Sequence, residues 1–206
     1  MKNALLGVAA LALAAGMASA RPTYTIDFDT DAAGNVIAEG TTLSNQYAAW
    51  GVNFVPNVLS GGDWATNTDM TITSIDVGGG YQASYGNILH SFDGWLAEDG
   101  DANFGMYFDS AISDLTVRFT GEFDFLSEVA LFDGQGNFIT SSLATGDGTL
   151  SSVTFTGLST AETAVVLPGW FLDWVGVVDI SFTPVPAPAG FGLAAMAGLA
   201  AARRRR

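Results

Sequence analysis

Carboxylates outnumber every other side chain that could do chemistry in this sequence, and two acidic clusters have the composition of a cation site. Asp27, Asp29 and Asp31 alternate ahead of Gly34-Asn35, and a second acidic run contains Asp99 and Asp101. Calcium takes about six to eight oxygen ligands, which alternating acids beside a glycine can supply in part. Neither stretch has the glycine and the final glutamate of an EF-hand loop. The clusters predict a structural calcium ion, the one cofactor expected; the alternative is a solvent-facing acidic strand.

Aromatic side chains are the second group with a chemical use. The flat apolar faces that could pack on sugar rings come from Trp50, Trp64, Trp95, Trp170, Trp174, Tyr81 and Tyr85. Trp64 and Trp95 stand among Gly, Asp and Asn, as aromatics on exposed loops do, which makes these two the candidate carbohydrate contacts. The competing interpretation is core packing, where aromatic residues are common.

Catalytic patterns are weak. His90 is the only histidine and the chain has no cysteine, so a triad would need His90 to meet a serine and an acid in space. Glycoside hydrolysis needs two opposed carboxylates, and no pair among twenty-one acids is distinguished by spacing. No phosphate loop or dinucleotide motif is present. The sequence therefore predicts that the protein is not an enzyme.

Short strands must position these residues. Alternating apolar residues occur at 104–108, 114–120 and 178–182, and further strand candidates are 23–28, 51–55, 70–77, 128–132, 138–141 and 150–155. The Asp, Gly and Asn residues of 132–138 predict a hairpin turn. No stretch between the termini has a sustained helical period. The expected fold is all-β: an antiparallel β-sandwich of jelly-roll type.

Charge excludes some partners. Twenty-one acids face only Arg21 and Arg118 over residues 21–183, which gives this region a charge of −19 and no lysine. Such a surface repels nucleic acid, so no nucleic-acid partner is expected. With no cysteine, the region has no disulfides.

The first twenty residues have the three zones of a secretory signal. Lys2 gives a positive start, an apolar run follows, and Ala18 and Ala20 suit cleavage before Arg21. The apolar run is too short to span a bilayer. We therefore expect a signal helix over 1–20, signal peptidase as a partner, and export through the inner membrane.

The last residues, 184–206, repeat this order in mirror image. Val185, Pro186, Ala187 and Pro188 interrupt regular structure, an apolar Ala/Gly run follows, and Arg203, Arg204, Arg205 and Arg206 close the chain. This arrangement resembles the PEP-CTERM sorting signal of Gram-negative bacteria, in a Pro-Ala-Pro variant. The resemblance implies a hydrophobic transmembrane helix, an exosortase-type sorting enzyme as partner, and a location in the cell envelope or extracellular matrix.

A second resemblance covers the region between these signals. Phe28-Asp29, Gly34-Asn35, Leu43 to Ala48 and Gly51 to Phe54, with 176–182 near the end, are similar to the β-sandwich domains that PEP-CTERM proteins carry. Those domains resemble galactose-binding-like or lectin-like sandwiches. The likeness implies that a calcium ion would join the first and last strands, pairing Asp27 or Asp29 with Asp179.

The predicted protein thus has a β-sandwich over 21–183 between two targeting signals that are expected to be removed. Its expected function is non-catalytic: a surface or matrix protein associated with extracellular polysaccharide. The alternative is a secreted glycoside hydrolase or lyase on a sandwich scaffold.

Overall fold

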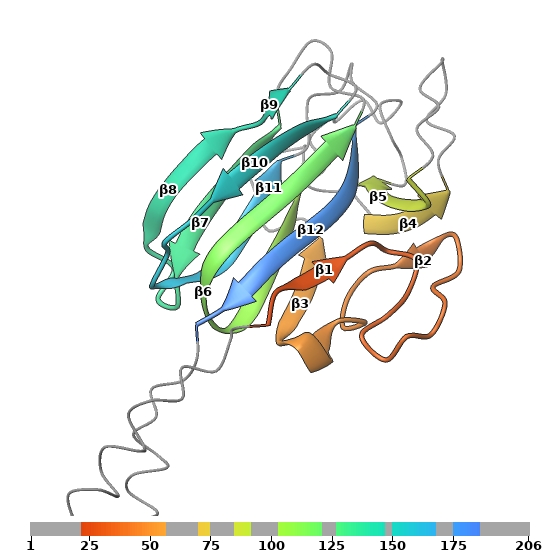
Figure 1. Cartoon of the computed structure of the whole chain (residues 1–206), viewed down its shortest axis with the longest axis horizontal. Coiled ribbons are helices and arrows are strands. Elements are labelled where there is room, and N and C mark those ends of the chain that lie inside the picture. The colour runs from red at the N-terminus through yellow and green to blue at the C-terminus, as the bar shows by residue number, and fades with distance from the viewer. Residues whose placement is uncertain are drawn as a thin grey trace, which may run out of the picture.

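The computed structural model describes residues 22–56, 70–74, 85–91, 103–120, 127–146, 150–167 and 175–185. The fold is an antiparallel β-sandwich (Figure 1), as predicted. Its elements are β1 (Tyr24–Ile26), β2 (Thr41–Thr42), the 3₁₀ turn η1 (Ala48–Trp50), β3 (Val52–Pro56), β4 (Met70–Ser74), β5 (Asn87–Ser91), β6 (Phe104–Thr120), β7 (Glu128–Asp133), β8 (Phe138–Leu143), β9 (Thr145–Gly146), β10 (Ser151–Phe155), β11 (Ala161–Leu167) and β12 (Gly176–Pro184). In this part of the chain no helix has the length and apolar character needed to cross a membrane.

The long strand β6 belongs to both layers of the sandwich. Its first part, 104–108, lies between β3 and β11. Its second part, 112–120, lies between β12 and β10. Figure 1 shows β6 turning at the lower end of the molecule, so that the sheet folds over on itself. A strand that changes layer in this way is a usual corner of packed sheets.

Alternating apolar residues build the core between the layers. Leu115, Val117 and Phe119 of β6 are fully buried, and they face the same core as Met106 from the other half of the strand. Removing these side chains from water at about 25 cal/mol per Å² is the main stabilising contribution of such a fold. The period-two pattern at 104–108 and 114–120 correctly predicted this inward face.

The first and last strands lie side by side. β1 pairs antiparallel with β12, with Tyr24 opposite Phe182 and Ile26 opposite Ile180. Since the chain enters β1 where it leaves β12, residue 22 and residue 185 lie at the same end of the sandwich. The backbone N–H of Val185 donates to the carbonyl of Ala111, which holds this end of β12 against the turn of β6.

Two loops share a five-residue sequence, Asp-x-x-Gly-Asn, at 31–35 and 133–137. In both, the aspartate Oδ1 accepts backbone N–H bonds from the second and fourth residues after it, at 2.8–2.9 Å. In both, the asparagine Nδ2 donates to Oδ2 of the same aspartate, at 2.8 and 2.9 Å. Gly34 and Gly136 have φ of 82° and 80°, which glycine adopts without steric cost. The second loop is the β7–β8 turn, so the predicted hairpin at 132–138 is confirmed.

Several sequence predictions fall outside the described residues. They are the signal peptide with Ala18, Ala20 and Arg21, the tail from Pro186 to Arg206, and the candidate residues Trp64, Trp95, Asp99 and Asp101.

Candidate binding site

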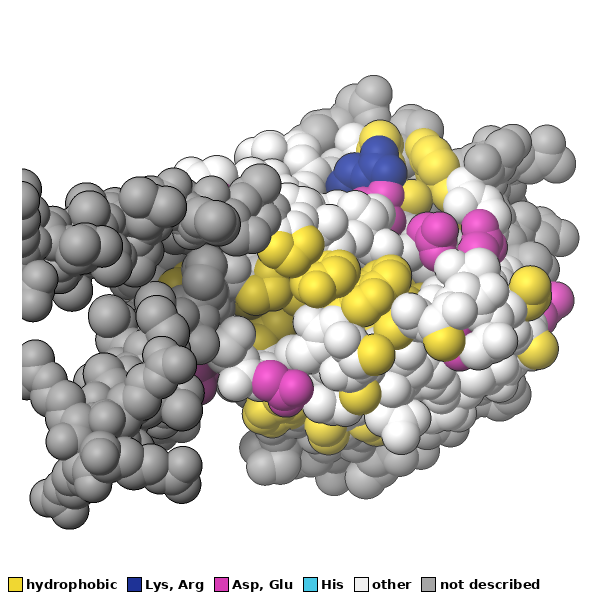
Figure 2. Space-filling model, turned by 60° about the horizontal axis from the view of Figure 1, so that its bottom comes forward, with side chains coloured by type: hydrophobic (Ala, Val, Ile, Leu, Met, Phe, Trp, Pro, Cys, Tyr) yellow, Lys and Arg dark blue, Asp and Glu magenta, His cyan; other side chains and the backbone are white. Residues whose placement is uncertain are grey.

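A surface pocket of about 260 Å³ lies where β6 turns between the layers. Its walls come from β1, η1, the turn of β6 and the end of β12: Tyr24, Ala48, Ala49, Trp50, Gly51, Phe108, Asp109, Ser110, Ile112, Phe182 and Pro184. Figure 2 brings this end forward and shows hydrophobic side chains gathered in one band with a recess beside it. The strand pairing that closes the sandwich therefore also builds a hollow at its corner.

Two stacked aromatic rings form one wall of the pocket. The rings of Tyr24 and Trp50 are 5.3 Å apart and nearly parallel, at 15°. Tyr24 also packs on Phe182, and Trp50 packs on Tyr47 at the core side. Both Tyr24 and Trp50 are half-buried, so they still present part of their surface to solvent. These contacts fix the two rings in place before any ligand arrives.

The short turn η1 sets the position of Trp50. The N–H groups of Trp50 and Gly51 donate to the carbonyls of Tyr47 and Ala48, both at 2.9 Å. Gly51 ends the turn with φ of 80°, a left-handed conformation that glycine adopts easily. β3 begins directly after this turn and pairs with β6. Trp50 therefore lies beside the corner at which β6 changes layer.

Two polar residues also line the pocket. Asp109 and Ser110 are exposed at the turn of β6. The Asp109 N–H donates to the carbonyl of Gly51 at 2.9 Å, which ties the turn of β6 to the end of η1. A Cβ at position 51 would lie 3.7 Å from the Asp109 Cβ, an ordinary contact distance, so Asp109 lies directly beside the end of η1. Among the described residues that line the pocket, Asp109 is the only acid.

Tyr47, which packs against Trp50 on the core side, carries no charge. Tyr47 is fully buried in the core cluster beneath Trp50. Burial raises the pKa of its phenol well above the usual range, and the nearby negative charge of Asp27 raises it further. The hydroxyl therefore stays protonated, and the floor beneath the aromatic wall remains neutral.

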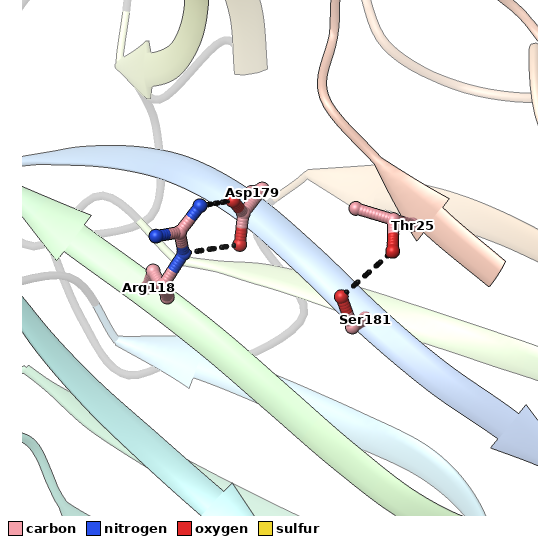
Figure 3. Close-up of polar contacts among 4 residues, drawn as sticks. All are labelled: Thr25, Arg118, Asp179 and Ser181. Atoms are coloured by element: carbon pink, nitrogen blue, oxygen red, sulfur yellow. Dashed lines mark hydrogen bonds and ion pairs between the residues drawn. The ribbon is translucent and has the colours of Figure 1, made fainter. Parts of the chain in front are cut away.

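The three aspartates expected to bridge β1 and β12 through calcium have other partners. Asp179 forms an ion pair with Arg118 (Figure 3). Asp27 accepts the backbone N–H of Asp29 at 3.1 Å, and Asp29 accepts the N–H of Asn87 at 2.9 Å. The described residues contain no group of three or more acids or histidines that could hold a metal ion. Asp179 is thus paired with Arg118 in this structure, and calcium stays a prediction both for Asp27 or Asp29 with Asp179 and for Asp99 and Asp101.

Of the other sequence candidates, His90 lies on β5 and its side chain is outside the described atoms. Trp50 was one of several aromatics considered for sugar contact, and it does line the pocket. Tyr24, Asp109 and Ser110 were not predicted. One signal was available for the last two: they interrupt the alternation between the apolar runs 104–108 and 114–120.

No protein-family model matches the chain, and no curated protein matches it. Among solved structures, it is similar to the family 32 carbohydrate-binding module of C. perfringens NanJ in complex with galactose. That match has 12% identity and a TM-score of 0.39, and it covers 65% of this chain and 94% of the module. TmCBM61, solved with β-1,4-galactotriose, matches at 10% identity and TM-score 0.31, over 71% of this chain and 95% of the module.

A third match is the catalytic unit of an α-1,3-glucanase from Streptomyces thermodiastaticus. It has 12% identity and a TM-score of 0.29, with 74% of this chain and 29% of the enzyme covered. Likenesses this distant carry no argument about the ligand of this chain, which has to come from its own residues.

Proposed function

We propose that this chain is an exported, non-catalytic protein of the cell surface or extracellular matrix that binds carbohydrate in the pocket at the turn of β6. One observation carries the proposal: the stacked rings of Tyr24 and Trp50 lie in the same pocket as the carboxylate of Asp109. Pockets that hold small ligands combine apolar and aromatic walls with a few polar groups that fix orientation.

The aromatic wall and the polar residues of the pocket match the two kinds of surface that a sugar ring has. A pyranose has an apolar C–H surface, which packs on aromatic side chains, and hydroxyls around its edge, which a carboxylate and a serine hydroxyl can bind. The volume of about 260 Å³ is just below the range of roughly 300–1,000 Å³ that holds drug-sized ligands. It suits one sugar residue at a time, such as a chain end or a branch.

The carboxylates among the described lining residues bear on the choice between binding and cleavage. Glycoside hydrolases place two carboxyl groups about 5–9 Å apart across the scissile bond. The described residues that line this pocket include Asp109 and no other acid. The alternative function, a polysaccharide-acting enzyme, gains no supporting observation at this site.

Export and sorting are the second part of the proposal. Signal peptidase would act before Arg21, and an exosortase-like enzyme would act at Val185-Pro186-Ala187-Pro188 while the tail lies in the inner membrane. The pairing of β1 with β12 brings residues 22 and 185, next to the two proposed cleavage sites, to the same end of the sandwich, so both signals would extend from one end. Mass spectrometry of the protein from envelope and medium tests it: loss of Arg203–Arg206 is expected, and a mature surface form that retains these arginines would contradict sorting.

Binding is tested with a pair of matched tyrosine variants. Tyr24→Ala removes half of the stacked wall, whereas Tyr107→Ala removes an exposed tyrosine of β6 that does not line the pocket. The purified protein is titrated with neutral oligosaccharides and applied to polysaccharide columns. We expect Tyr24→Ala to weaken binding about tenfold or more, since an aromatic anchor contributes about 2 kcal/mol at a binding site. Tyr107→Ala should bind like the wild type.

Two results would overturn the proposal. One is a wild-type protein that binds no polysaccharide. The other is equal loss of binding in both tyrosine variants, which would place the site elsewhere. Thermal unfolding of each variant shows whether Tyr24→Ala has lost its fold, and Trp50→Ala, which removes the other ring of the stack, then provides a second variant of the pocket.

A further inference from the structure

The outer edge of β8 is the second feature of the molecule that indicates an interaction. β8 ends the path of the sheet, and among the described strands it forms a ladder only with β7. Figure 1 shows it at the left margin of the sandwich. An edge strand leaves a row of backbone N–H and C=O groups without ladder partners, which another strand can bind.

Exposed apolar side chains are concentrated on this strand. Six large hydrophobic residues are exposed in the described part of the chain, and three of them lie on β8. Phe138 is 61% exposed, Ile139 37% and Leu143 53%. Phe138 is partly covered by the ring of Phe132, at 5.8 Å.

The strand also lacks the features that protect sheet edges. Natural edge strands carry lysine, proline or charges that prevent pairing with other chains. Residues 134–146 contain no charged residue and no proline. A bulge interrupts the register of β8 near the hairpin, but Thr140 to Leu143 pair regularly with β7. These four residues are the part of the edge that is straight and uncharged.

The distribution of charge bears on where two copies of this chain can meet. The whole chain has a formal charge of −14, so two copies repel one another over most of their surfaces. β8 itself carries no acid, so two copies can approach along this strand with less repulsion than elsewhere; the acid in register with it is Glu128 of β7, opposite Leu143. An antiparallel pair of identical strands is self-complementary about a two-fold axis, as a symmetric dimer requires.

We propose that β8 pairs with β8 of a second copy, forming a symmetric dimer through a sheet that continues across both molecules. Six residues span about 20 Å of strand, so the contact is smaller than the interface of roughly 1,200–2,000 Å² that stable complexes bury. The dimer is therefore weak and depends on concentration. Salt strengthens it, because screening reduces the repulsion between the acidic surfaces.

Sedimentation velocity of the purified protein, over a range of concentrations and at low and high salt, tests the dimer with two matched variants. Leu143→Lys places a charge on the edge. Val36→Lys makes the same charge change at a residue that is 84% exposed and lies away from β8. We expect the dissociation constant to rise at least about tenfold in Leu143→Lys and to remain within about twofold of the wild type in Val36→Lys.

A second measurement does not depend on the variants. Hydrogen exchange of the wild type should slow at 140–143 as concentration rises, and nowhere else on β7 or β8 to the same extent. The proposal is overturned if the wild type stays monomeric at all concentrations and salts. It is also overturned if self-association persists unchanged in Leu143→Lys, because another surface would then be responsible. Carbohydrate binding by the pocket is independent of these outcomes.

Discussion

Arg118 on β6 and Asp179 on β12 lie directly opposite one another on neighbouring strands and form a two-point ion pair (Figure 3). Arg118 Nε donates to Asp179 Oδ1 at 2.8 Å, and Nη2 contacts Oδ2. Arg118 is the only lysine or arginine of residues 22–185. The hydrogen bond to Asp179 raises the pKa of the guanidinium, so Arg118 stays charged at all ordinary pH values. Arg118, the one basic side chain of residues 22–185, thus neutralises a carboxylate within the sheet.

The two partners of this pair are not equivalent, which gives the first prediction. The Asp179 side chain is 12% exposed and that of Arg118 is 41% exposed. Arg118→Met leaves a mostly buried carboxylate without its donor and should lower the free energy of unfolding by about 2 kcal/mol. Asp179→Asn leaves an arginine that water can reach and should cost under about 1 kcal/mol. Urea unfolding of both variants and of the double variant measures this difference; a larger loss in Asp179→Asn would contradict it.

The sequence predicts the strands that are buried on one face much better than those buried on both. Leu115, Val117 and Phe119 alternate with polar residues because β6 has a solvent side there, so the pattern was visible. β11 was missed, since it lies between β6 and β7 and buries Ala164, Val165 and Val166 in succession, leaving no alternation. Central strands of this kind appear in the sequence as short apolar runs, which periodicity alone cannot distinguish from buried helix segments.

The site was harder to predict than the fold, for a different reason. Tyr24, Trp50 and Asp109 are far apart in sequence and meet only because β6 turns between the layers. Nothing in the local sequence encodes that turn beyond a break in alternation. The positive φ of Phe28, 63°, is also invisible in sequence, because a buried phenylalanine rarely adopts it and tertiary packing imposes it here.

Two glycines with the same backbone conformation give the second prediction. Gly86 and Gly34 have φ of 83° and 82°. A Cβ at position 86 would lie 2.5 Å from Oδ2 of Asp29, whereas position 34 has no atom within 4 Å. Gly34→Ala should cost about 1 kcal/mol from backbone strain alone. Gly86→Ala should cost at least about 2 kcal/mol, because it also displaces the carboxylate that binds the N–H of Asn87.

Chemical denaturation of the two alanine variants compares the glycines directly. Equal losses of stability would show that Asp29 moves aside freely and that its bond to Asn87 contributes little. The difference between the two variants is the informative quantity, since the φ strain is common to both.

The repeated Asp-x-x-Gly-Asn loops give a pH prediction. Hydrogen bonds from Asn137 hold the pKa of Asp133 below its usual 3.8, and Asn35 acts in the same way on Asp31. A carboxyl whose pKa is lower in the folded state stabilises the fold above pH 3.8, and this contribution is lost as pH falls through the folded pKa. NMR titration of the carboxyl carbons should find both groups below 3.8. Asn137→Ala should raise the pKa of Asp133 toward 3.8 and leave that of Asp31 unchanged. If the pKa of Asp133 does not change in this variant, the hydrogen bonds from Asn137 do not lower it.

The last prediction concerns which sugars the pocket selects. The described residues that line the pocket include Asp109 and no lysine or arginine, and the chain as a whole is strongly acidic. Uronic acids should therefore be repelled, and a sugar with a free amine should be favoured over its neutral N-acetylated form. An exposed ion pair contributes up to about 1 kcal/mol, so the preference for the amine should be about fivefold at low salt and should decrease as salt is added.

Calorimetric titrations with amine-bearing, N-acetylated and uronate oligosaccharides of equal length measure this order. Asp109→Asn should abolish the preference for the amine while keeping affinity for the neutral sugar, because the stacked rings of Tyr24 and Trp50 are unchanged. Asp114→Asn is the matched control, since it removes the same charge from β6 outside the pocket. If both variants lose the preference equally, the overall charge of the protein selects the ligand. If only Asp109→Asn loses the preference, the carboxylate of Asp109 selects the amine-bearing sugar.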